Sequence, residues 1–219
     1  VDGTVLSAVL HETAKVRRCG ALVGDICSVL TSICARADNL GSLLDSSETL
    51  SDVNVMQLCS ALFACNLNQR HGLLGALGLM RRLATRASCR VTLFDTGVLE
   101  LVGEYIWQPA AEEDEAGNTW RHDGPIVAAA ARVATALCVG LPEAQQLLVT
   151  SAEWLQALDG CLLQHCGDNA TADRLVTVCR NVAALNAEAA ASVTKHAGTG
   201  LAAVLGADGT PEAKAPDNA

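Results

Sequence analysis

The chain has 219 residues, half of them hydrophobic but only 3% aromatic, and its formal net charge is -9 at pH 7. Because clustered lysines and arginines supply most of the affinity for phosphate backbones, this charge argues against nucleic acid as the main partner. No stretch reaches the roughly 18 uncharged apolar residues that a membrane-spanning helix needs, since the most apolar one, residues 126–141, contains Arg132. Long stretches rich in Ala, Leu and Arg predict an all-α fold with essentially no sheet.

The first 35 residues carry apolar side chains on more than one helical face. We therefore expect this segment to lie inside a longer array of helices or to need a neighbour that covers it. Residues 19–35 (CGALVGDICSVLTSICA) are typical of a turn followed by a helix. Because the chain starts at Val1 and not at methionine, we expect a fragment or a processed form.

Ten cysteines are spread along apolar stretches, with no C-x-x-C pair among them. Cys27 and Cys34 are two helical turns apart, and Cys59, Cys138 and Cys179 stand where Ala or Val would also fit. Free cysteine packs as a small hydrophobic residue, so we predict buried, reduced thiols. Reduced thiols favour a cytoplasmic location, with a nuclear or cytoskeleton-associated one as the alternative.

Three segments share one pattern, residues 76–84 (ALGLMRRLA), 130–138 (AARVATALC) and 175–183 (LVTVCRNVA). In each segment apolar residues recur at spacings of three and four, which predicts a helix with one buried stripe. The predicted stripe residues are Ala76, Leu79 and Leu83, then Ala130, Val133 and Leu137, then Leu175, Val178 and Val182.

The segments that follow these helices are also alike. Each reads as a short helix, a break at a small residue and a second amphipathic helix, with the breaks at Gly97, Ser151 and Gly198. Glycine at such a break can end a helix in the left-handed conformation. The repeating unit that we predict therefore has three helices.

This unit resembles the armadillo repeat, whose long third helix ends in the pattern LxNLA. Residues 180–183 (RNVA), after Cys179, are the nearest copy, and residues 70–102 follow the same order of helices. The resemblance covers most of residues 50–207 and, more loosely, residues 19–35 as a turn plus second helix. It implies a right-handed superhelix (α-solenoid) of about four repeats over residues 1–207.

Three regions depart from the repeat pattern. Leu62 and Leu83 both lie in candidate third helices, yet the gap between them is too short for a full unit, so residues 51–85 are expected to be irregular. Residues 108–124, which include the run EEDE, are expected to be a flexible acidic insertion. Residues 208–219 lack apolar periodicity and are expected to be a disordered tail or linker.

In armadillo proteins the third helices stack into a concave groove that receives an extended peptide. The resemblance implies that the groove positions lie one, five and eight residues before the last stripe residue, on one helical face. These positions are Gly75, Gly78 and Arg82, then Ala129, Arg132 and Ala136, then Arg174, Thr177 and Asn181.

The groove residues differ from those of armadillo nuclear-import adaptors, which carry Trp and Asn four positions apart. Only Asn181 fits that pattern here, whereas Arg82, Arg132 and Arg174 recur along the stripe, with Arg81 and Arg180 next to it. Arginine binds carboxylates through two parallel hydrogen bonds. The resemblance therefore implies a binding module for an acidic partner segment. The alternative is that these arginines are ordinary solvated charges.

No pattern indicates an enzyme, a metal site, a cofactor or a small-molecule substrate. The five histidines are scattered, and no phosphate-binding glycine loop appears. His165 and Cys166 are adjacent and point to different helix faces, which disfavours a nucleophile pair. We expect a non-enzymatic module that binds a protein or peptide. The alternative is a structural, scaffolding subunit of a cytoskeletal, ciliary or other assembly.

Overall fold

A computed structural model describes residues 8–9, 12, 19–36, 38–40, 42–44, 55–66, 69–107 and 120–207. Every regular element in these ranges is helical, so the predicted all-α fold is confirmed for them. The labelled elements are α2 (Gly20–Ile33), α4 (Val55–Cys65), α5 (Arg70–Leu83), α6 (Ala87–Asp95), α7 (Val98–Val102), the π-helical turn η1 (Gly103–Trp107), the 3-10 turn η2 (Trp120–His122), α8 (Gly124–Cys138), α9 (Pro142–Thr150), α10 (Ala152–His165), α11 (Asn169–Ala183) and α12 (Ala187–Ala207).

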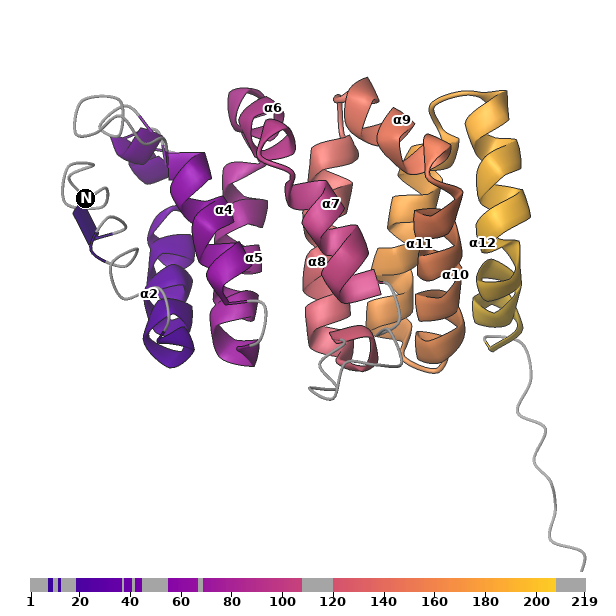
Figure 1. The fold of residues 1–219 in the computed structure, drawn as a ribbon, viewed down its shortest axis with the longest axis horizontal. Helices are drawn as coiled ribbons and strands as arrows, with labels where there is room; N and C mark the ends of the chain where they lie inside the picture. The colour runs from indigo at the N-terminus through magenta and orange to yellow at the C-terminus, as the bar shows by residue number, and fades with distance from the viewer. Residues whose placement is uncertain are drawn as a thin grey trace, which may run out of the picture.

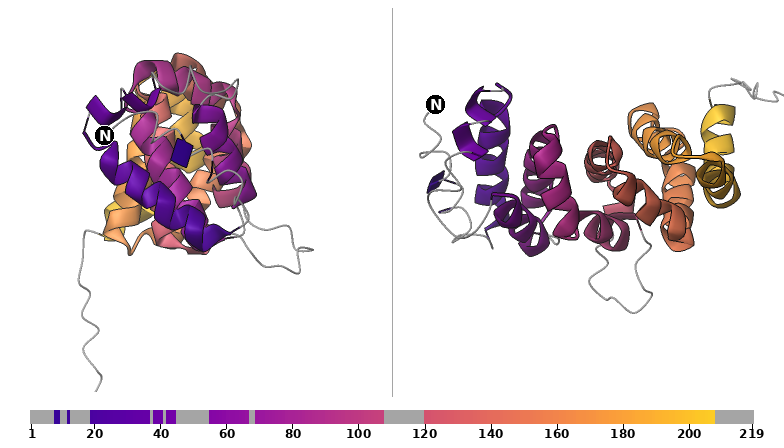
Figure 2. Two further views of the ribbon diagram at one scale, coloured as in Figure 1. Left: turned by 90° about the vertical axis from the view of Figure 1, so that its left-hand side faces the viewer. Right: turned by 90° about the horizontal axis from the view of Figure 1, so that it is seen from above.

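Four helices stand side by side in one row, α2, α5, α8 and α11, and each packs on the next (Figure 1). We call them the first row. On one side of this row, nearer to the viewer in Figure 1, α4 packs on α5, α7 on α8, and α10 on both α11 and α12. The view from above in Figure 2 keeps the same order from the N-terminal to the C-terminal end. Neighbouring helices in the first row therefore come from segments some 50 residues apart in sequence.

The three repeated segments fall in α5, α8 and α11, and their predicted stripes are buried. Each of the nine stripe residues is at most 1% exposed. The same core contains small side chains such as Ala131 and Ala134. Cys27, Cys34, Cys59, Cys138 and Cys179 are also buried, as predicted, while Cys19 and Cys65 are exposed. Small core residues allow the helices to approach closely.

Local signals set the helix ends. The Asp123 carboxylate accepts a hydrogen bond from the Ile126 amide at 3.2 Å and so caps α8. The Ser151 hydroxyl caps α10 by accepting from the Trp154 amide at 3.4 Å. Gly97 lies between α6 and α7 with φ of 74°, the left-handed conformation. The predicted breaks at Gly97 and Ser151 are therefore confirmed.

The predicted break at Gly198 is wrong, because α12 continues through it to Ala207. The neighbouring Gly200 serves a close contact with α10 instead. Its amide donates to the Asp159 carboxylate at 2.6 Å, and a Cβ on it would lie 2.5 Å from the Leu162 Cβ. Glycine here allows two helices to meet and does not end one.

Two other assignments of helices are corrected. Residues 19–35 are not a turn plus second helix, because α2 is one continuous helix that stands in the first row and packs on α5. Leu62 does not lie in a third helix either. Its helix, α4, packs on α5 and beside α6, so no intervening unit is needed before Leu83. The expected irregularity of residues 51–85 is thus a simple α4–α5 pair over the part of that region that is described.

Two further expectations fall mainly on other parts of the chain. Residues 108–119 and 208–219 lie outside the described residues. Of the predicted acidic insertion, the described part contains the 3-10 turn Trp120–His122 and ends at Gly124, the first residue of α8. Asp123, which caps α8, also receives an ion pair from Arg70 at the start of α5, with 2.5 Å between Nε and Oδ2.

Candidate functional site

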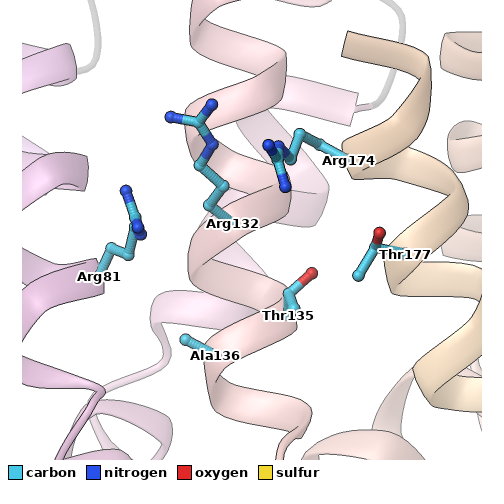
Figure 3. Close-up of a pocket in the computed structure, with 6 residues that line it drawn as sticks. All are labelled: Arg81, Arg132, Thr135, Ala136, Arg174 and Thr177. Carbon is cyan, nitrogen blue, oxygen red and sulfur yellow. The ribbon is translucent and has the colours of Figure 1, made fainter. Parts of the chain in front are cut away.

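A pocket of about 370 Å³ lies on the first row where α5, α8 and α11 stand next to one another (Figure 3). We call it the arginine pocket. It is lined by Arg81 from α5, by Arg132, Thr135 and Ala136 from α8, and by Arg174 and Thr177 from α11. In Figure 3, Arg81 and Arg132 extend into the gap between α5 and α8, and Arg174 extends towards α8.

The buried stripes place these side chains. Val133 and Leu137 of α8 face the hydrophobic core of the protein. Arg132 and Ala136, one position before each, therefore project from a different face of the helix. On α11, Val178 is buried and Arg174 and Thr177 lie on the neighbouring face. The repeated helix pattern therefore brings equivalent faces of consecutive helices to one surface.

The pocket concentrates positive charge. Desolvation lowers the pKa of Arg132, and the nearby guanidinium groups of Arg174 and Arg81 lower it further. Within the described part of the chain, neither Arg81 nor Arg132 forms an ion pair. Arg174 Nη1 lies 3.4 Å from an Asp173 carboxylate oxygen, while its Nε is buried without a hydrogen-bond partner there. Repulsion between like charges is therefore only partly offset within the protein.

Four of the predicted groove residues line the pocket, namely Arg132, Ala136, Arg174 and Thr177. Arg81 and Thr135 were not among the predicted groove residues. Arg81 had been noted only as the neighbour of Arg82, and Thr135 lies three residues after Arg132, a spacing that marks the same helical face. The pocket therefore contains four of the predicted groove residues, all on α8 and α11, and Arg81 is the arginine that α5 contributes.

Arg82 does not line the pocket. Its guanidinium donates hydrogen bonds to the carbonyl oxygens of Cys34 and Ala35, just beyond the C-terminal end of α2. The last carbonyls of a helix lack partners within it, and a cation near them is favourable. Arg82 therefore joins α5 to α2, and one step along the helix turns Arg81 towards α8 instead.

The other predicted groove positions also lie outside the pocket. Gly75 is buried, and a Cβ on it would lie 2.8 Å from the Gly24 Cα of α2. At Gly78 a Cβ would have only the Thr31 hydroxyl nearby, at 3.8 Å. Ala129 is half-buried against the core. The carbonyl of Asn181 accepts from the Gln145 side chain of α9 at 2.9 Å. The predicted groove residues at these positions pack against other helices or lie outside the pocket.

The thiols of the core are poorly suited to act as nucleophiles. Burial raises the pKa of Cys138, Cys161 and Cys179 to about 12 and that of Cys27 to about 11. A thiol with such a pKa stays protonated near pH 7, and the thiolate is the nucleophilic form. His165 is buried and its Nε2 lies 2.8 Å from the Arg121 carbonyl oxygen, a structural contact between α10 and η2.

Two other kinds of site are absent from the described residues. No group of three or more His, Cys, Asp or Glu side chains is placed there to hold a metal ion. None of the helices described has the length and apolar character needed to cross a bilayer.

Comparisons of the chain with protein-family models, with curated proteins and with solved structures return no match. The resemblance to armadillo repeats thus rests on the sequence pattern alone.

Proposed function

We propose that the chain is an armadillo-like helical repeat segment, a right-handed superhelix of about four repeats, that binds an acidic segment of a partner protein along its first row of helices. Three lines support this architecture. The repeated pattern recurs in α5, α8 and α11, these helices are consecutive neighbours, and each has a shorter or second helix packed on it. The proposed module acts by binding and not by catalysis.

The observation that carries the proposal is the arginine pocket. Three consecutive helices each contribute one arginine to a single hollow, and desolvation together with the charges of Arg174 and Arg81 lowers the pKa of Arg132. Holding like charges together has a free-energy cost unless an anion binds between them. A carboxylate from a partner offsets that cost and accepts paired hydrogen bonds from a guanidinium group.

The overall charge narrows the partner class. A net charge of -9 repels extended polyanions at long range, so a nucleic acid is disfavoured while a short acidic segment can reach a local cationic pocket. The buried thiols of the core suit a reducing compartment, which supports a cytoplasmic location, including association with the nucleus or the cytoskeleton.

Charge reversal in the pocket tests this proposal. The full chain is titrated with a fluorescent oligoglutamate peptide, and Arg132→Glu and Arg174→Glu are compared with the unchanged protein by anisotropy. We expect each variant to weaken binding about tenfold or more, because the peptide meets a carboxylate in place of a guanidinium.

Arg180→Glu is the matched control for that titration. Arg180 is an exposed arginine on α11 that does not line the pocket. It carries the same change in net charge and should alter the affinity about twofold at most, since exposed charges outside the contact are screened. Equal losses for Arg180→Glu and Arg132→Glu, or no binding of the peptide by the unchanged protein, would rule out this pocket as the binding site.

One observation favours the alternative of a structural subunit. α2 presents Leu22 and Val29 to solvent, 43% and 58% exposed, and Leu205 of α12 is 75% exposed. Exposed apolar side chains at the two ends of an array suit permanent contacts with other subunits. Salt distinguishes the two functions. A groove complex held by arginine pairs dissociates in about 1 M NaCl, where charges are screened within about 3 Å, whereas an apolar interface persists.

A further inference from the structure

The arginine pocket carries more positive charge than one carboxylate offsets. We propose that its specific ligand is a phosphorylated serine or threonine side chain within the partner segment. This inference rests on the proposed function and names the group that the pocket selects. Three guanidinium groups from three helices line it, together with the hydroxyl groups of Thr135 and Thr177.

Charge and shape both favour a phosphoryl group. A phosphate monoester carries a charge of about -1.5 to -2 at pH 7 and presents three acceptor oxygens in three directions. A carboxylate has a single charge and two oxygens in one plane. Arg81, Arg132 and Arg174 approach from α5, α8 and α11, and three acceptor oxygens that point in three directions suit donors that come from three helices.

The pocket contains hydrogen-bond donors that have no partner among the described residues and are available to this ligand. Arg174 Nε is buried without a partner among the described residues. The Thr177 hydroxyl donates to the Asp173 carbonyl at 2.8 Å, so its proton is already committed. No hydrogen bond of the Thr135 hydroxyl to another described residue occurs, which leaves Thr135 as the hydroxyl donor of the pocket.

The lining of the pocket and the charge of the chain favour a phosphorylated peptide over a nucleotide or a phosphorylated lipid. The pocket volume of about 370 Å³ is roughly twelve times the ~30 Å³ that one water molecule occupies in the liquid, so it exceeds a monatomic anion. Ala136 is the one apolar residue in the lining, and no aromatic side chain is present on which a nucleotide base could stack. The net charge of -9 opposes approach to an anionic bilayer. A phosphoryl group on a peptide is therefore favoured.

Asp173 sets the strength of this interaction. Its carboxylate lies 3.4 Å from Arg174 Nη1 and therefore competes with an incoming anion for the same donor. The affinity for a phosphorylated peptide should rise in Asp173→Asn, which keeps the size of the side chain and removes its charge. We expect a gain of about two- to fivefold, because the Asp173 side chain is exposed and its pairing is screened.

The test uses three fluorescent peptides of nine residues that differ only at the central position, which is serine, glutamate or phosphoserine, with aspartates on either side. Anisotropy titrations with the full chain should rank phosphoserine at least tenfold tighter than glutamate, and serine weakest. Inorganic phosphate should displace the phosphoserine peptide, and vesicles containing phosphoinositides should not bind.

Variants assign the selectivity to the pocket. Arg132→Lys retains the charge but lacks the planar fork of donors. It should therefore reduce the preference for phosphoserine over glutamate severalfold, while Arg180→Gln, outside the pocket, leaves that preference unchanged. Circular dichroism of each variant establishes that it is folded.

The possible outcomes separate this inference from the proposed function. Equal affinities for the glutamate and phosphoserine peptides, both lost in Arg132→Glu, overturn the phosphoryl inference and leave the acidic-segment function standing. No binding of either peptide overturns both. Tighter binding to phosphoinositide vesicles than to the phosphoserine peptide overturns the assignment to a peptide. A preference for phosphoserine that disappears in Arg132→Lys supports the inference.

Discussion

Two junctions in the first row use the same helix positions in opposite ways. Gly75 and Arg174 both lie eight residues before the last stripe residue of their helices, Leu83 and Val182. At the α2–α5 junction Gly75 brings the two backbones together, with Gly24 opposite it. At the junction of α5, α8 and α11, Arg174 and its neighbours line a pocket of about 370 Å³. We call the first junction the glycine seam.

The difference shows that the repeat fixes where helices stand, while side-chain size decides whether a junction closes or opens. In the glycine seam, a Cβ on Gly24 would lie 2.6 Å from the His71 carbonyl oxygen, so only glycine permits this approach. In the pocket, three long charged side chains from neighbouring helices line a hollow and do not pack together. The tight contact therefore lies between α2 and α5, and the pocket lies across α5, α8 and α11.

Alkaline pH should give the largest effect, and it reaches both junctions. Burial raises the pKa of Cys27, beside the glycine seam, to about 11 and that of Cys138, in α8, to about 12, from an ordinary value of 9.0. The folded protein keeps these thiols neutral, so their contribution is complete below pH 9. It is lost as the pH rises towards 11 for Cys27 and 12 for Cys138. Each thiol costs about 1.4 kcal/mol per pH unit in that range.

Urea unfolding from pH 8 to pH 10.5 measures this loss in the unchanged protein and in Cys27→Ala and Cys138→Ala. Each variant should lose stability less steeply with pH than the parent, whatever its stability at pH 8. Cys65→Ala, at an exposed position, is the control. A pH slope unaltered by either buried substitution contradicts the prediction.

Adding one methyl group should distinguish the closed junction from open surface. Gly75→Ala places a Cβ 2.8 Å from Gly24 Cα and 3.1 Å from the Cys27 Cβ, and we expect it to lower the free energy of unfolding. The net loss should be about 1–3 kcal/mol, as for other overpacked cores. Urea denaturation at pH 7 measures it.

Gly78→Ala is the matched control on the same helix. The nearest atom to its Cβ is the Thr31 hydroxyl oxygen at 3.8 Å, so no clash opposes the substitution. Alanine is favoured over glycine within a helix by up to about 1 kcal/mol, and this variant should be more stable than the parent. If both variants moved stability in the same direction, the glycine seam would not be a tight contact.

The next largest difference is expected between substitutions of Arg81 and Arg82, adjacent arginines on α5 that belong to different junctions. Arg82 donates to the carbonyl oxygens of Cys34 and Ala35, so Arg82→Ala should lower the free energy of unfolding by about 1–2 kcal/mol. Arg81→Ala should leave stability nearly unchanged and instead weaken peptide binding, because Arg81 lines the pocket. Thermal denaturation measures the stability of both variants, and anisotropy measures their affinity for the peptide. Equal stabilities for the two variants would refute the prediction.

The smallest expected change in stability comes from the repulsion between the arginines of the pocket. Arg132→Gln removes the charge that Arg81 and Arg174 oppose. It should stabilise the protein by about 0.5 kcal/mol at most, because Arg132 is exposed and solvent screens the repulsion. The gain should shrink as NaCl is raised, whereas Arg180→Gln should show no such salt dependence. A destabilised Arg132→Gln would mean that this arginine supports the fold.

Much of the fold follows from local pattern. The stripes of α5, α8 and α11 were predicted correctly because an apolar spacing of three and four has no stable solution other than a buried helix face. The errors have a different origin. Gly97, Gly198 and Gly200 look alike in sequence, but Gly97 lies between two helices with a positive φ, Gly198 lies inside α12 with open space beside it, and Gly200 permits contact with α10. A glycine does not reveal which neighbour approaches it.

Some residues of the candidate site could be predicted from the sequence, and others could not. Arg132, Ala136, Arg174 and Thr177 followed from counting along helices whose neighbours are equivalent. Arg82 could not be separated from Arg81 in this way. α2 stands against α5 and supplies free carbonyl groups, and these attract Arg82. Which arginine of α5 contacts α2 therefore depends on residues that lie far from α5 in the sequence.

The sequence by itself therefore determined the class of secondary structure, the faces that are buried and the recurrence of arginine along one stripe, because all three depend on spacings within single helices. Tertiary structure decided that α2 belongs to the first row, that its glycines close the seam with α5, and that Arg81, Arg132 and Arg174 share a pocket. These outcomes depend on distances between helices, which side-chain size and packing set only once the whole row is assembled.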